Sequence, residues 1–350
     1  MAAVSISIAE TIAGIRPLDQ GAMEAARARQ DILTKPQGAL GRLEEISIRL
    51  AGITGQRIPR IGRKVIIVMA ADHGVTAEGV SAYPAEVTPQ MVANFDAGGA
   101  AINVLARHVG AEVRVVDMGV GRPTANFAHG AAMTPEQARD CVERGVAAAC
   151  EEIDGGATLL ATGDMGIGNT TASSAVVAAI TGHPVRQVTG RGTGVSDEQF
   201  ERKVAVIEQA LRVNQPDRQD ALDILAKVGG FEIGAIAGVI LGAASRRVPV
   251  IVDGFISGAG QLIASELCGA AMDYTFAAHR SVEIGHAIVL NRLSQLPLLS
   301  LDLRLGEGTG AALAMSIVEA AAKILAEMAT FGDAGVSEAL DKQAESGATS

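Results

Sequence analysis

The segment Lys64–Gly74, KVIIVMAADHG, decides the fold class of this chain. Its apolar run Val65–Met69 is short, continuous and rich in β-branched residues, which is typical of a strand buried on both faces of a parallel sheet. A polar tip, Asp72-His73-Gly74, follows this run directly. The same pattern recurs in the runs Val113–Val116, Thr158–Ala161 and Val248–Val252.

Helical spacing occupies the segments between these runs. We expect helices over Thr88–His108, Pro135–Glu152, Thr171–Thr181 and Phe200–Asn214. Strand, loop and helix in repeated order predict an α/β fold, doubly wound around a mostly parallel sheet. Each run ends in a polar or glycine-rich tip, and in such sheets the ligand crevice lies at the carboxyl ends of the strands. The later tips are Asp117-Met118-Gly119, Gly163-Asp164-Met165-Gly166 and Asp253-Gly254-Phe255.

Both ends of the chain read as helical. Helix-type spacing covers Glu24–Leu33 and Leu40–Ala51, and the breaker Lys35-Pro36-Gln37-Gly38 separates them. We therefore expect a small helical domain from residues 1–60 plus about 305–336, and a Rossmann-like α/β domain over about 61–304. Residues 337–350 are small and polar, and we expect a frayed tail there.

The composition fits a globular protein and excludes several classes. Apolar residues make up 48% of the chain, so a sizeable core can be buried. The net charge of -10 argues against a nucleic-acid partner. Three cysteines form no CxxC pair, which argues against a zinc site or a disulfide framework. No basic region opens the chain and no uncharged apolar run reaches roughly 18 residues, so we expect a cytoplasmic protein without a membrane partner.

The loop GDMGIGNTTASS, residues 163–174, is the most informative local segment. Gly166 and Gly168 let the backbone bend tightly. Asn169 and Thr170 then open a helix with free N–H groups and hydroxyls, an arrangement that suits a phosphate or a carboxylate. A capped helix that follows a strand, without any ligand, is the alternative interpretation.

A second glycine-rich loop, TGRGTGVSDEQFERK, spans residues 189–203. Gly190 and Gly192 could approach an anion, and Lys203 could supply a point charge from the helix that follows. The alternative is a flexible connection with a surface lysine. No lysine in the chain directly follows a glycine, so a Walker A loop is excluded.

The segment LGEGTGAALAM, which begins at Leu305, places a carboxylate in an unusual position. Glu307 lies between Gly306 and Gly308, just before a helix of small and apolar residues. Such a carboxylate could meet a ligand directly and accept a proton, or it could only complement the positive end of the helix. The preceding Leu301–Leu305 is too charged for a clear core strand, so the glycine pattern is weak evidence for dinucleotide binding.

Taken together, these segments resemble the nicotinate-nucleotide–dimethylbenzimidazole phosphoribosyltransferases of cobalamin lower-ligand assembly. The matching stretches follow the family's order over most of the chain. They are KPQGALGRLEEI from Lys35, ADHGVTAEGVSAYPAEVTPQMVANF from Ala71, GDMGIGNTT from Gly163, NQPD from Asn214 with KVGGFEIGAIAG from Lys227, DGFISGA from Asp253 and RLGEGTGAALAM from Arg304.

The resemblance implies a reaction, a fold and an assembly. The phosphoribosyl group of nicotinate mononucleotide would pass to 5,6-dimethylbenzimidazole, giving nicotinate and α-ribazole 5′-phosphate with inversion at the anomeric carbon. It also implies a parallel α/β domain with a small helical domain, a homodimer, and no metal or organic cofactor. Glu307 matches the family's proposed catalytic base.

The resemblance also assigns binding residues. Gly166, Gly192, Lys203 and Ser281 match positions at the phosphate and ribose of the nucleotide. The segment that lines the benzimidazole pocket contains Tyr83, Gln90 and Met91. Asp164, a secondary catalytic candidate, stands where many relatives have glutamate, so its reach is one methylene shorter.

Two other functions are compatible with an α/β fold. A nicotinamide-cofactor dehydrogenase would need GxGxxG in the first strand–helix turn, but that turn reads ADHGVTAEG, residues 71–79. A non-catalytic nucleotide-binding module would bind the ligand without forming a product, and a turnover assay would separate it from an enzyme.

Overall fold

The computed structural model describes residues 7–192, 194 and 196–337. The chain divides into two compact units. Unit 1 comprises Met1–Leu18 and Ile61–Ile317, and unit 2 comprises Asp19–Arg60 and Val318–Ser350. Apart from its first residue, the predicted frayed tail, residues 337–350, lies outside the described residues.

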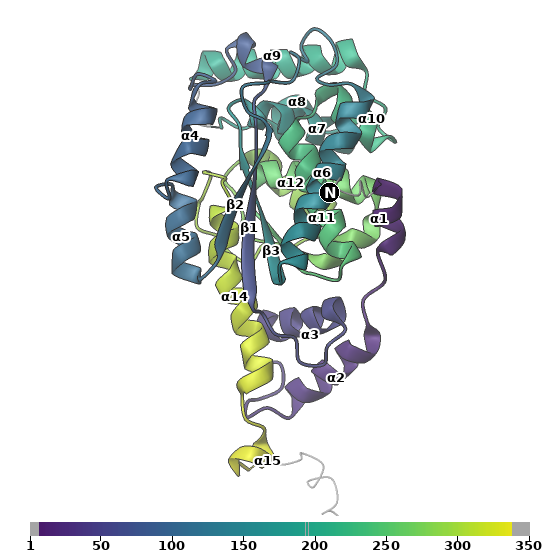
Figure 1. Ribbon diagram of the computed structural model, residues 1–350, viewed down its shortest axis with the longest axis vertical. Coiled ribbons are helices and arrows are strands. Elements are labelled where there is room, and N and C mark those ends of the chain that lie inside the picture. Colours follow the sequence, from purple (N-terminus) through teal and green to yellow (C-terminus); the bar gives the residue numbers. More distant parts are fainter. Residues whose placement is uncertain (1–6, 193, 195, 338–350) are drawn as a thin grey trace, which may run out of the picture. The chain divides into compact units, whose positions relative to one another are not determined.

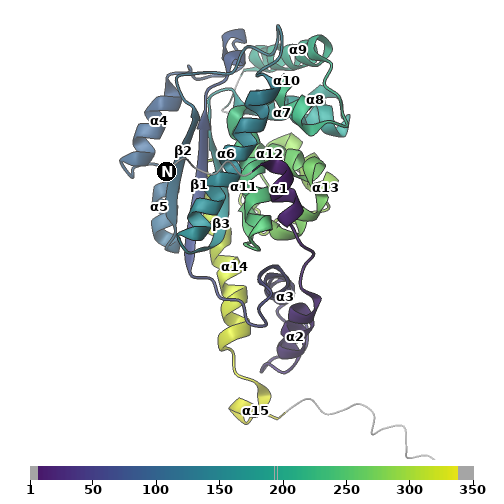
Figure 2. The same ribbon diagram turned by 45° about the vertical axis from the view of Figure 1, so that its right-hand side comes forward.

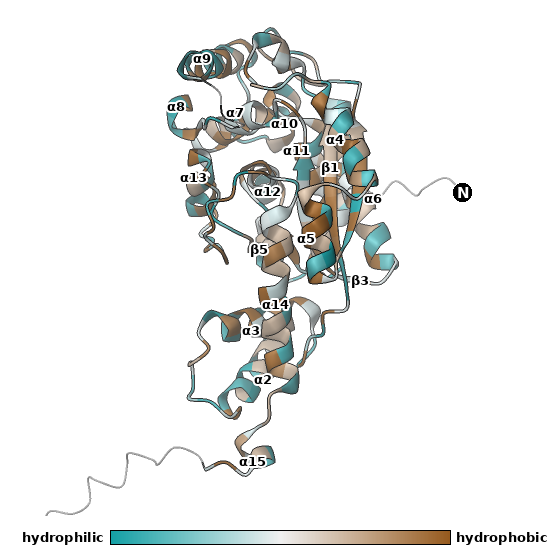
Figure 3. Ribbon diagram, turned by 90° about the vertical axis from the view of Figure 1, so that its left-hand side faces the viewer, coloured by the Kyte–Doolittle hydropathy of each residue, from teal (hydrophilic) through white to brown (hydrophobic). Residues whose placement is uncertain are grey.

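Unit 1 is built on a five-stranded parallel sheet with the strand order β2-β1-β3-β4-β5 (Figure 1). The strands are β1 (Arg63–Ala71), β2 (Glu112–Gly119), β3 (Ala157–Met165), β4 (Val250–Val252) and β5 (Thr275–Ala277). Residues 64–71 of β1 are all buried, as the continuous apolar run predicts, and Figure 3 shows this strand as hydrophobic. The predicted fold class is confirmed, and β5 is a strand that sequence analysis missed.

The strand order reverses between β1 and β3. The chain leaves β1 for β2 on one side and then returns to β3 on the other side. In doubly wound sheets a ligand crevice forms at such a switch point, outside the carboxyl ends of the strands. The order therefore directs attention to the residues that follow β1 and β3.

Helices cover both faces of this sheet. Figures 1 and 2 show α4 and α5 on one face, and α6 and α11 on the other. The helices of unit 1 are α1 (Ile8–Gly14), η1 (Gly74–Glu78), α4 (Val87–Asp96), α5 (Ala101–Val109), α6 (Pro135–Asp154), α7 (Asn169–Thr181), α8 (Val185–Val188), α9 (Asp197–Asn214), α10 (Ala221–Val228), α11 (Phe231–Ser245), α12 (Phe255–Leu267), η2 (Gly269–Tyr274), α13 (Ile284–Arg292) and the first half of α14 (Thr309–Glu327).

The expected single helix over Thr88–His108 is wrong, because two helices occupy this stretch. α4 ends at Asp96 and α5 begins at Ala101. Gly98 adopts a φ of +75°, a left-handed conformation that glycine adopts readily and that cannot continue a helix.

Glycine also sets the packing of α6 against α11. A Cβ on Gly145 would lie 1.9 Å from the carbonyl oxygen of Ala235, and a Cβ on Gly238 would lie 1.9 Å from that of Val142. The two backbones therefore meet directly, and a methyl group at either position would force them apart. Part of the high glycine content of the chain is thus a packing requirement.

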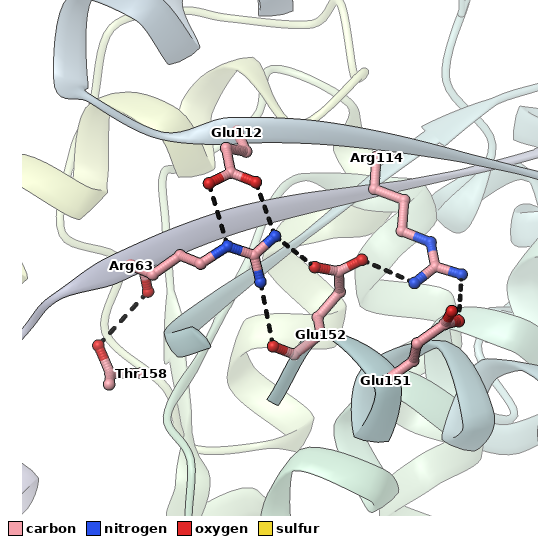
Figure 4. Close-up of polar contacts among 6 residues, drawn as sticks. All are labelled: Arg63, Glu112, Arg114, Glu151, Glu152 and Thr158. Atoms are coloured by element: carbon pink, nitrogen blue, oxygen red, sulfur yellow. Dashed lines mark hydrogen bonds and ion pairs between the residues drawn. The ribbon is translucent and has the colours of Figure 1, made fainter. Parts of the chain in front are cut away.

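An ion-pair network ties the amino ends of β1 and β2 to α6 (Figure 4). Arg63 Nη2 lies 2.6 Å from Glu112 Oε2 and 2.8 Å from Glu152 Oε2. Arg114 contacts Glu152 at 2.6 Å and Glu151 at 2.6 Å. Because these strands begin at Arg63 and Glu112, the network lies at the edge opposite to the expected ligand crevice.

Unit 2 contains α2 (Gln20–Asp31), α3 (Arg42–Thr54), the second half of α14 and α15 (Phe331–Ala334). Its apolar core joins Ala22 and Ala26 of α2 to Ala51 of α3 and Leu325 of α14. Arg29 Nε also donates a hydrogen bond to the carbonyl oxygen of Leu325, at 2.5 Å.

The bounds of unit 2 differ from the predicted small helical domain. The segment up to Leu18 belongs to unit 1, where α1 contacts α6 and α11. The hydroxyl of Tyr274 donates to the carbonyl oxygen of Arg16 at 2.7 Å, which fixes the end of this segment. Residues 305–317 also belong to unit 1.

Candidate active site

A cavity of about 630 Å³ opens in unit 1 beside the carboxyl end of β3. The tips that follow β3, β4 and β5 all contribute to its wall, as expected for a doubly wound sheet. Sequence-predicted residues that line it are Tyr83, Met91, Asp164, Gly166, Asn169, Thr170, Gly192, Ser281, Gly306 and Glu307.

Three predicted residues lie beside this cavity rather than in its lining. Gly168 and Lys203 line a small adjoining pocket of about 30 Å³, and Gly190 lines a neighbouring pocket of about 400 Å³. Gln90 lies exposed on α4 and lines none of these pockets, whereas its neighbour Met91 lines the main cavity.

Glu307 adopts a backbone conformation that is rare outside glycine. Its φ is +61°, between Gly306 at +82° and Gly308 at +89°. The left-handed region costs a non-glycine residue roughly 1–2 kcal/mol. The conformation brings this carboxylate to the cavity wall, with only 5% of the residue exposed.

The surroundings of Glu307 suit a proton acceptor. Oε2 is buried and has no hydrogen-bond partner among the described residues. Burial raises the pKa of this carboxyl, and the backbone amide of Ile102 partly opposes the shift. An unpartnered carboxylate with a raised pKa readily takes a proton from a bound ligand.

Asp164, at the end of β3, has a different environment. Its Oδ2 accepts a hydrogen bond from Asn169 Nδ2 at 3.0 Å, and its Oδ1 is buried without a partner among the described residues. Burial raises its pKa well above the usual range, and the negative charges of Asp253, Glu232 and Glu307 raise it further. Burial and the neighbouring charges therefore both favour the neutral form of Asp164.

Asp253, in the tip after β4, reaches the first turn of α14. Its Oδ1 accepts from the amide of Ala311 at 2.8 Å, and its Oδ2 accepts from the amide of Gly308 at 3.3 Å. Burial raises the pKa of Asp253 to about 7, against the opposing effect of these backbone amides. The side chain does not line the cavity.

The two glycine-rich loops meet at an anion-binding arrangement. Gly168, with a φ of +95°, precedes α7, and the first turn of α7 lies beside the small pocket. In that turn the amides of Asn169 and Thr171 donate to the carbonyl oxygens of Gly166, at 3.0 Å, and Gly168, at 2.9 Å. Lys203 Nζ donates to Thr170 Oγ1 at 2.8 Å and to the carbonyl oxygen of Gly190 at 3.4 Å. An ammonium group next to a helix N-terminus favours a phosphate.

Lys203 is buried, with 1% of the residue exposed, so the surface-lysine interpretation is wrong. Burial lowers its pKa to about 8, and the negative charge of Glu283 partly opposes the shift. The alternative of a capped helix without a ligand remains compatible with α7 itself, but it does not explain a buried lysine at its first turn.

Four polar residues that line the cavity were not predicted from the sequence: His279, Glu283, Asp302 and Arg304. Arg304 Nη1 donates to the carbonyl oxygen of Gly192 at 3.0 Å and fixes the second loop. Burial raises the pKa of Glu283, and Lys203 opposes this effect. Recognition of β5 would have shown His279 and Glu283 as a further polar tip.

Two further features of the structure bear on metal binding and on membrane insertion. Over residues 7–192, 194 and 196–337, no group of three or more His, Cys, Asp or Glu could hold a metal ion. α14 is long and apolar enough to cross a membrane by length and composition, but more than half of it is buried inside the protein. A buried core helix meets the same criterion.

Comparison with known proteins gives one consistent family. A phosphoribosyltransferase family profile matches residues 15–336. The nicotinate-nucleotide–dimethylbenzimidazole phosphoribosyltransferase of Chloroflexus aggregans is 62% identical over 346 residues, covering 95% of this chain and 98% of the relative. That of Geobacter metallireducens is 55% identical over 350 residues, with 96% and 99% covered. The crystal structure of the Thermus thermophilus enzyme of the same name superposes with a TM-score of 0.87 at 47% identity, covering 92% of this chain and all of that one.

Proposed function

Because this chain belongs to the nicotinate-nucleotide–dimethylbenzimidazole phosphoribosyltransferase family, we infer that it transfers a phosphoribosyl group from nicotinate mononucleotide to 5,6-dimethylbenzimidazole. The products are nicotinate and α-ribazole 5′-phosphate, with inversion at the anomeric carbon. The observation that carries this function is the juxtaposition of Glu307 and the Lys203 pocket around one cavity. A dehydrogenase is excluded by the family, and a non-catalytic module does not fit it.

The leaving group needs no acid. In nicotinate mononucleotide the pyridine nitrogen is bonded to the anomeric carbon and carries a formal positive charge. When this C–N bond breaks, its electron pair returns to the ring nitrogen, and the pyridine ring leaves without that charge. The protein must therefore supply position and relief of charge on the incoming base.

Glu307 supplies that relief. The benzimidazole attacks through the lone pair of one ring nitrogen and becomes positively charged as the new C–N bond forms. Its other nitrogen carries the proton, which passes to the carboxylate of Glu307. Its unpartnered Oε2 is free to accept this proton. Such a base contributes about 10²–10⁴-fold to the rate.

The two substrates are assigned to different parts of the site. We assign the phosphate to Lys203, Thr170 and the N-terminal end of α7, with Gly166, Gly192 and Ser281 beside the phosphate and ribose. We assign the benzimidazole to the wall that contains Tyr83 and Met91. Holding both rings in line across the sugar supplies much of the remaining acceleration.

The direct test incubates the protein with nicotinate mononucleotide and 5,6-dimethylbenzimidazole. Mass spectrometry should detect ribazole phosphate, and released nicotinate should match it mole for mole. Nuclear Overhauser contacts in the product should identify the α anomer. Absence of product with every benzimidazole offered would overturn the proposal.

We further propose that the protein works in the cytoplasm as a homodimer, as its family resemblance implies. Sedimentation velocity should give a mass near twice the 35.7 kDa of the chain. A single species at the mass of one chain would contradict the dimer.

A further inference from the structure

The segment that carries Glu307 is fastened to the sheet by one buried side chain. Asp253 follows β4 and has no exposed surface. Its two oxygens accept separate backbone hydrogen bonds, from Gly308 at 3.3 Å and from Ala311 at 2.8 Å. One of these amides directly follows Glu307, and the other lies in the first turn of α14. Asp253 thus fixes the chain immediately after the proposed base.

β3 also contacts the segment that carries Glu307. A Cβ on Gly163 would lie 2.5 Å from the carbonyl oxygen of Glu307, so the strand backbone and this peptide are in direct contact. The amide of Asp253 also donates to Thr162 Oγ1 at 3.3 Å, which ties the two attachments together. A left-handed non-glycine residue persists only where its surroundings determine its conformation. Glu307, at φ +61°, has such surroundings.

We propose that Asp253 is a positioning residue for Glu307. Its carboxylate holds the amides that follow the base, so that the Glu307 side chain stays at the cavity wall in a conformation that the backbone alone disfavours. The inference rests on the proposed function, because it takes Glu307 to be the proton acceptor. Asp253 itself does not line the cavity.

A double-mutant cycle tests this role. In Asp253→Asn the amide oxygen can still accept one backbone hydrogen bond, but the NH₂ group cannot accept the other. A misplacement of the base by about an ångström should lower kcat about 10- to 100-fold, with the KM for nicotinate mononucleotide changed by less than about twofold. In the Glu307→Gln background, Asp253→Asn should lower kcat by less than about twofold, because no base remains to be positioned.

A matched control is available in α10. Asp220 accepts backbone hydrogen bonds from Leu222 at 3.0 Å and Asp223 at 3.1 Å, which is the same chemistry away from the cavity. Both contacts end on Asp220 Oδ1, so Asp220→Ala is the substitution that removes this helix cap. It should leave kcat unchanged in both backgrounds, and it reports what the loss of a helix cap does by itself.

The outcomes separate this inference from the proposed function. Wild-type turnover in Glu307→Gln would show that Glu307 is not the proton acceptor, and it would overturn this inference as well. A second outcome is a large loss of kcat in Glu307→Gln and, in that background, a further loss from Asp253→Asn equal to its loss in the wild-type protein. This outcome would overturn only the positioning role. If Asp253→Asn does not fold, Asp253→Ser, whose hydroxyl can accept one amide, enters the same cycle. Failure of both to fold would show a purely structural role and also overturn the inference.

Discussion

At the scale of single residues, the site separates two carboxyl groups by their environment. Both lie in the cavity wall, and burial raises the pKa of both. Asp164 also has the negative charges of Asp253 and Glu232 acting on it, and these favour its neutral form. Aspartate at position 164, which is shorter than glutamate, is therefore compatible with a mechanism in which Glu307 alone accepts the proton.

Replacement of Glu307 by glutamine should lower turnover by about 10²-fold or more. The amide resembles the carboxylate in shape but cannot take a proton at neutral pH. Single-turnover kinetics should show the loss in the chemical step, while nucleotide affinity, measured by calorimetry, should change far less.

Asp164→Asn is the control for this prediction. Asparagine resembles the neutral form of Asp164, and its oxygen can still accept the hydrogen bond from Asn169. Its effect on turnover should therefore be the smaller of the two. A larger loss in Asp164→Asn than in Glu307→Gln would move the base to Asp164.

Lys203 gives a prediction that depends on pH. Its pKa is lowered to about 8, so in the free enzyme the ammonium form loses its proton as the pH rises through that value. Below it the charged lysine attracts the phosphate, and above it this attraction is lost. kcat/KM for nicotinate mononucleotide should therefore fall above about pH 8.

Lys203→Ala tests the same contact. The KM for nicotinate mononucleotide should rise by about one to two decades, since a hydrogen bond to a charged group contributes roughly 1.5–3 kcal/mol. The KM for the benzimidazole should change less, and the fall above pH 8 should disappear. Equal effects on both substrates would assign Lys203 a structural role.

Part of the site could be predicted from local sequence, whereas Tyr83, Met91 and Ser281 were predicted only from the family resemblance. Glu307 and Lys203 belong to glycine-rich segments, and glycines at close backbone approaches are visible in a sequence. Glu283 could not be found in this way, because it follows a strand of only three residues, Thr275–Ala277, that leaves no clear apolar run. The outward position of Gln90 also depends on the orientation of α4, which the sequence does not give.

At the scale of elements, the strands buried on both faces were the most predictable. β1 and β3 are such strands, and each has a short, continuous apolar run. β2 was also found from its run, although its residues 113–116 are only half-buried. The alternation of these runs with helical segments predicts a parallel sheet. The break between α4 and α5 was missed, since helical spacing resumes after Gly98. α11 was also missed, because it is apolar on all sides and so lacks the periodicity that marks a surface helix.

The ion-pair network beside β1 predicts a local effect on stability. Arg63→Met removes the contacts with Glu112 and Glu152 and should lower the free energy of unfolding by about 1 kcal/mol. Turnover should not change, because the network lies at the strand edge opposite to the cavity. Urea denaturation measures the loss, which should shrink in 1 M salt, where the Debye length is about 3 Å.

Arg202→Met provides the comparison. Arg202 forms an ion pair with Glu198 at i,i+4, at 3.3 Å, and both side chains are exposed. Its replacement should cost no more than about 0.5 kcal/mol. Equal losses for the two arginines would show that the network adds nothing beyond single surface pairs.

At the scale of the whole molecule, two units of unequal size share one continuous helix, α14, whose residues pass from unit 1 to unit 2 after Ile317. The sequence indicated helical character at both chain ends but not where the division falls. α1 has the composition of a surface helix, and only its contacts with α6 and α11 assign it to unit 1.

Turnover should be independent of metal ions. The leaving pyridine departs without the formal charge on its nitrogen, and within the described ranges no set of three suitable side chains converges. Activity measured after extensive treatment with EDTA should equal that of untreated enzyme. Loss of activity that a single divalent ion restores would contradict this prediction.

The left-handed backbone at Glu307 also limits how this protein can be improved in the laboratory. A library selected only for thermal resistance should enrich glycine at position 307, since glycine removes both the unfavourable φ and a buried carboxylate. The variants enriched by such a selection would be more stable and would lack catalytic activity. A search for a more stable catalyst from this chain must therefore select for product at every round, because glycine at position 307 would increase stability and remove the proposed base.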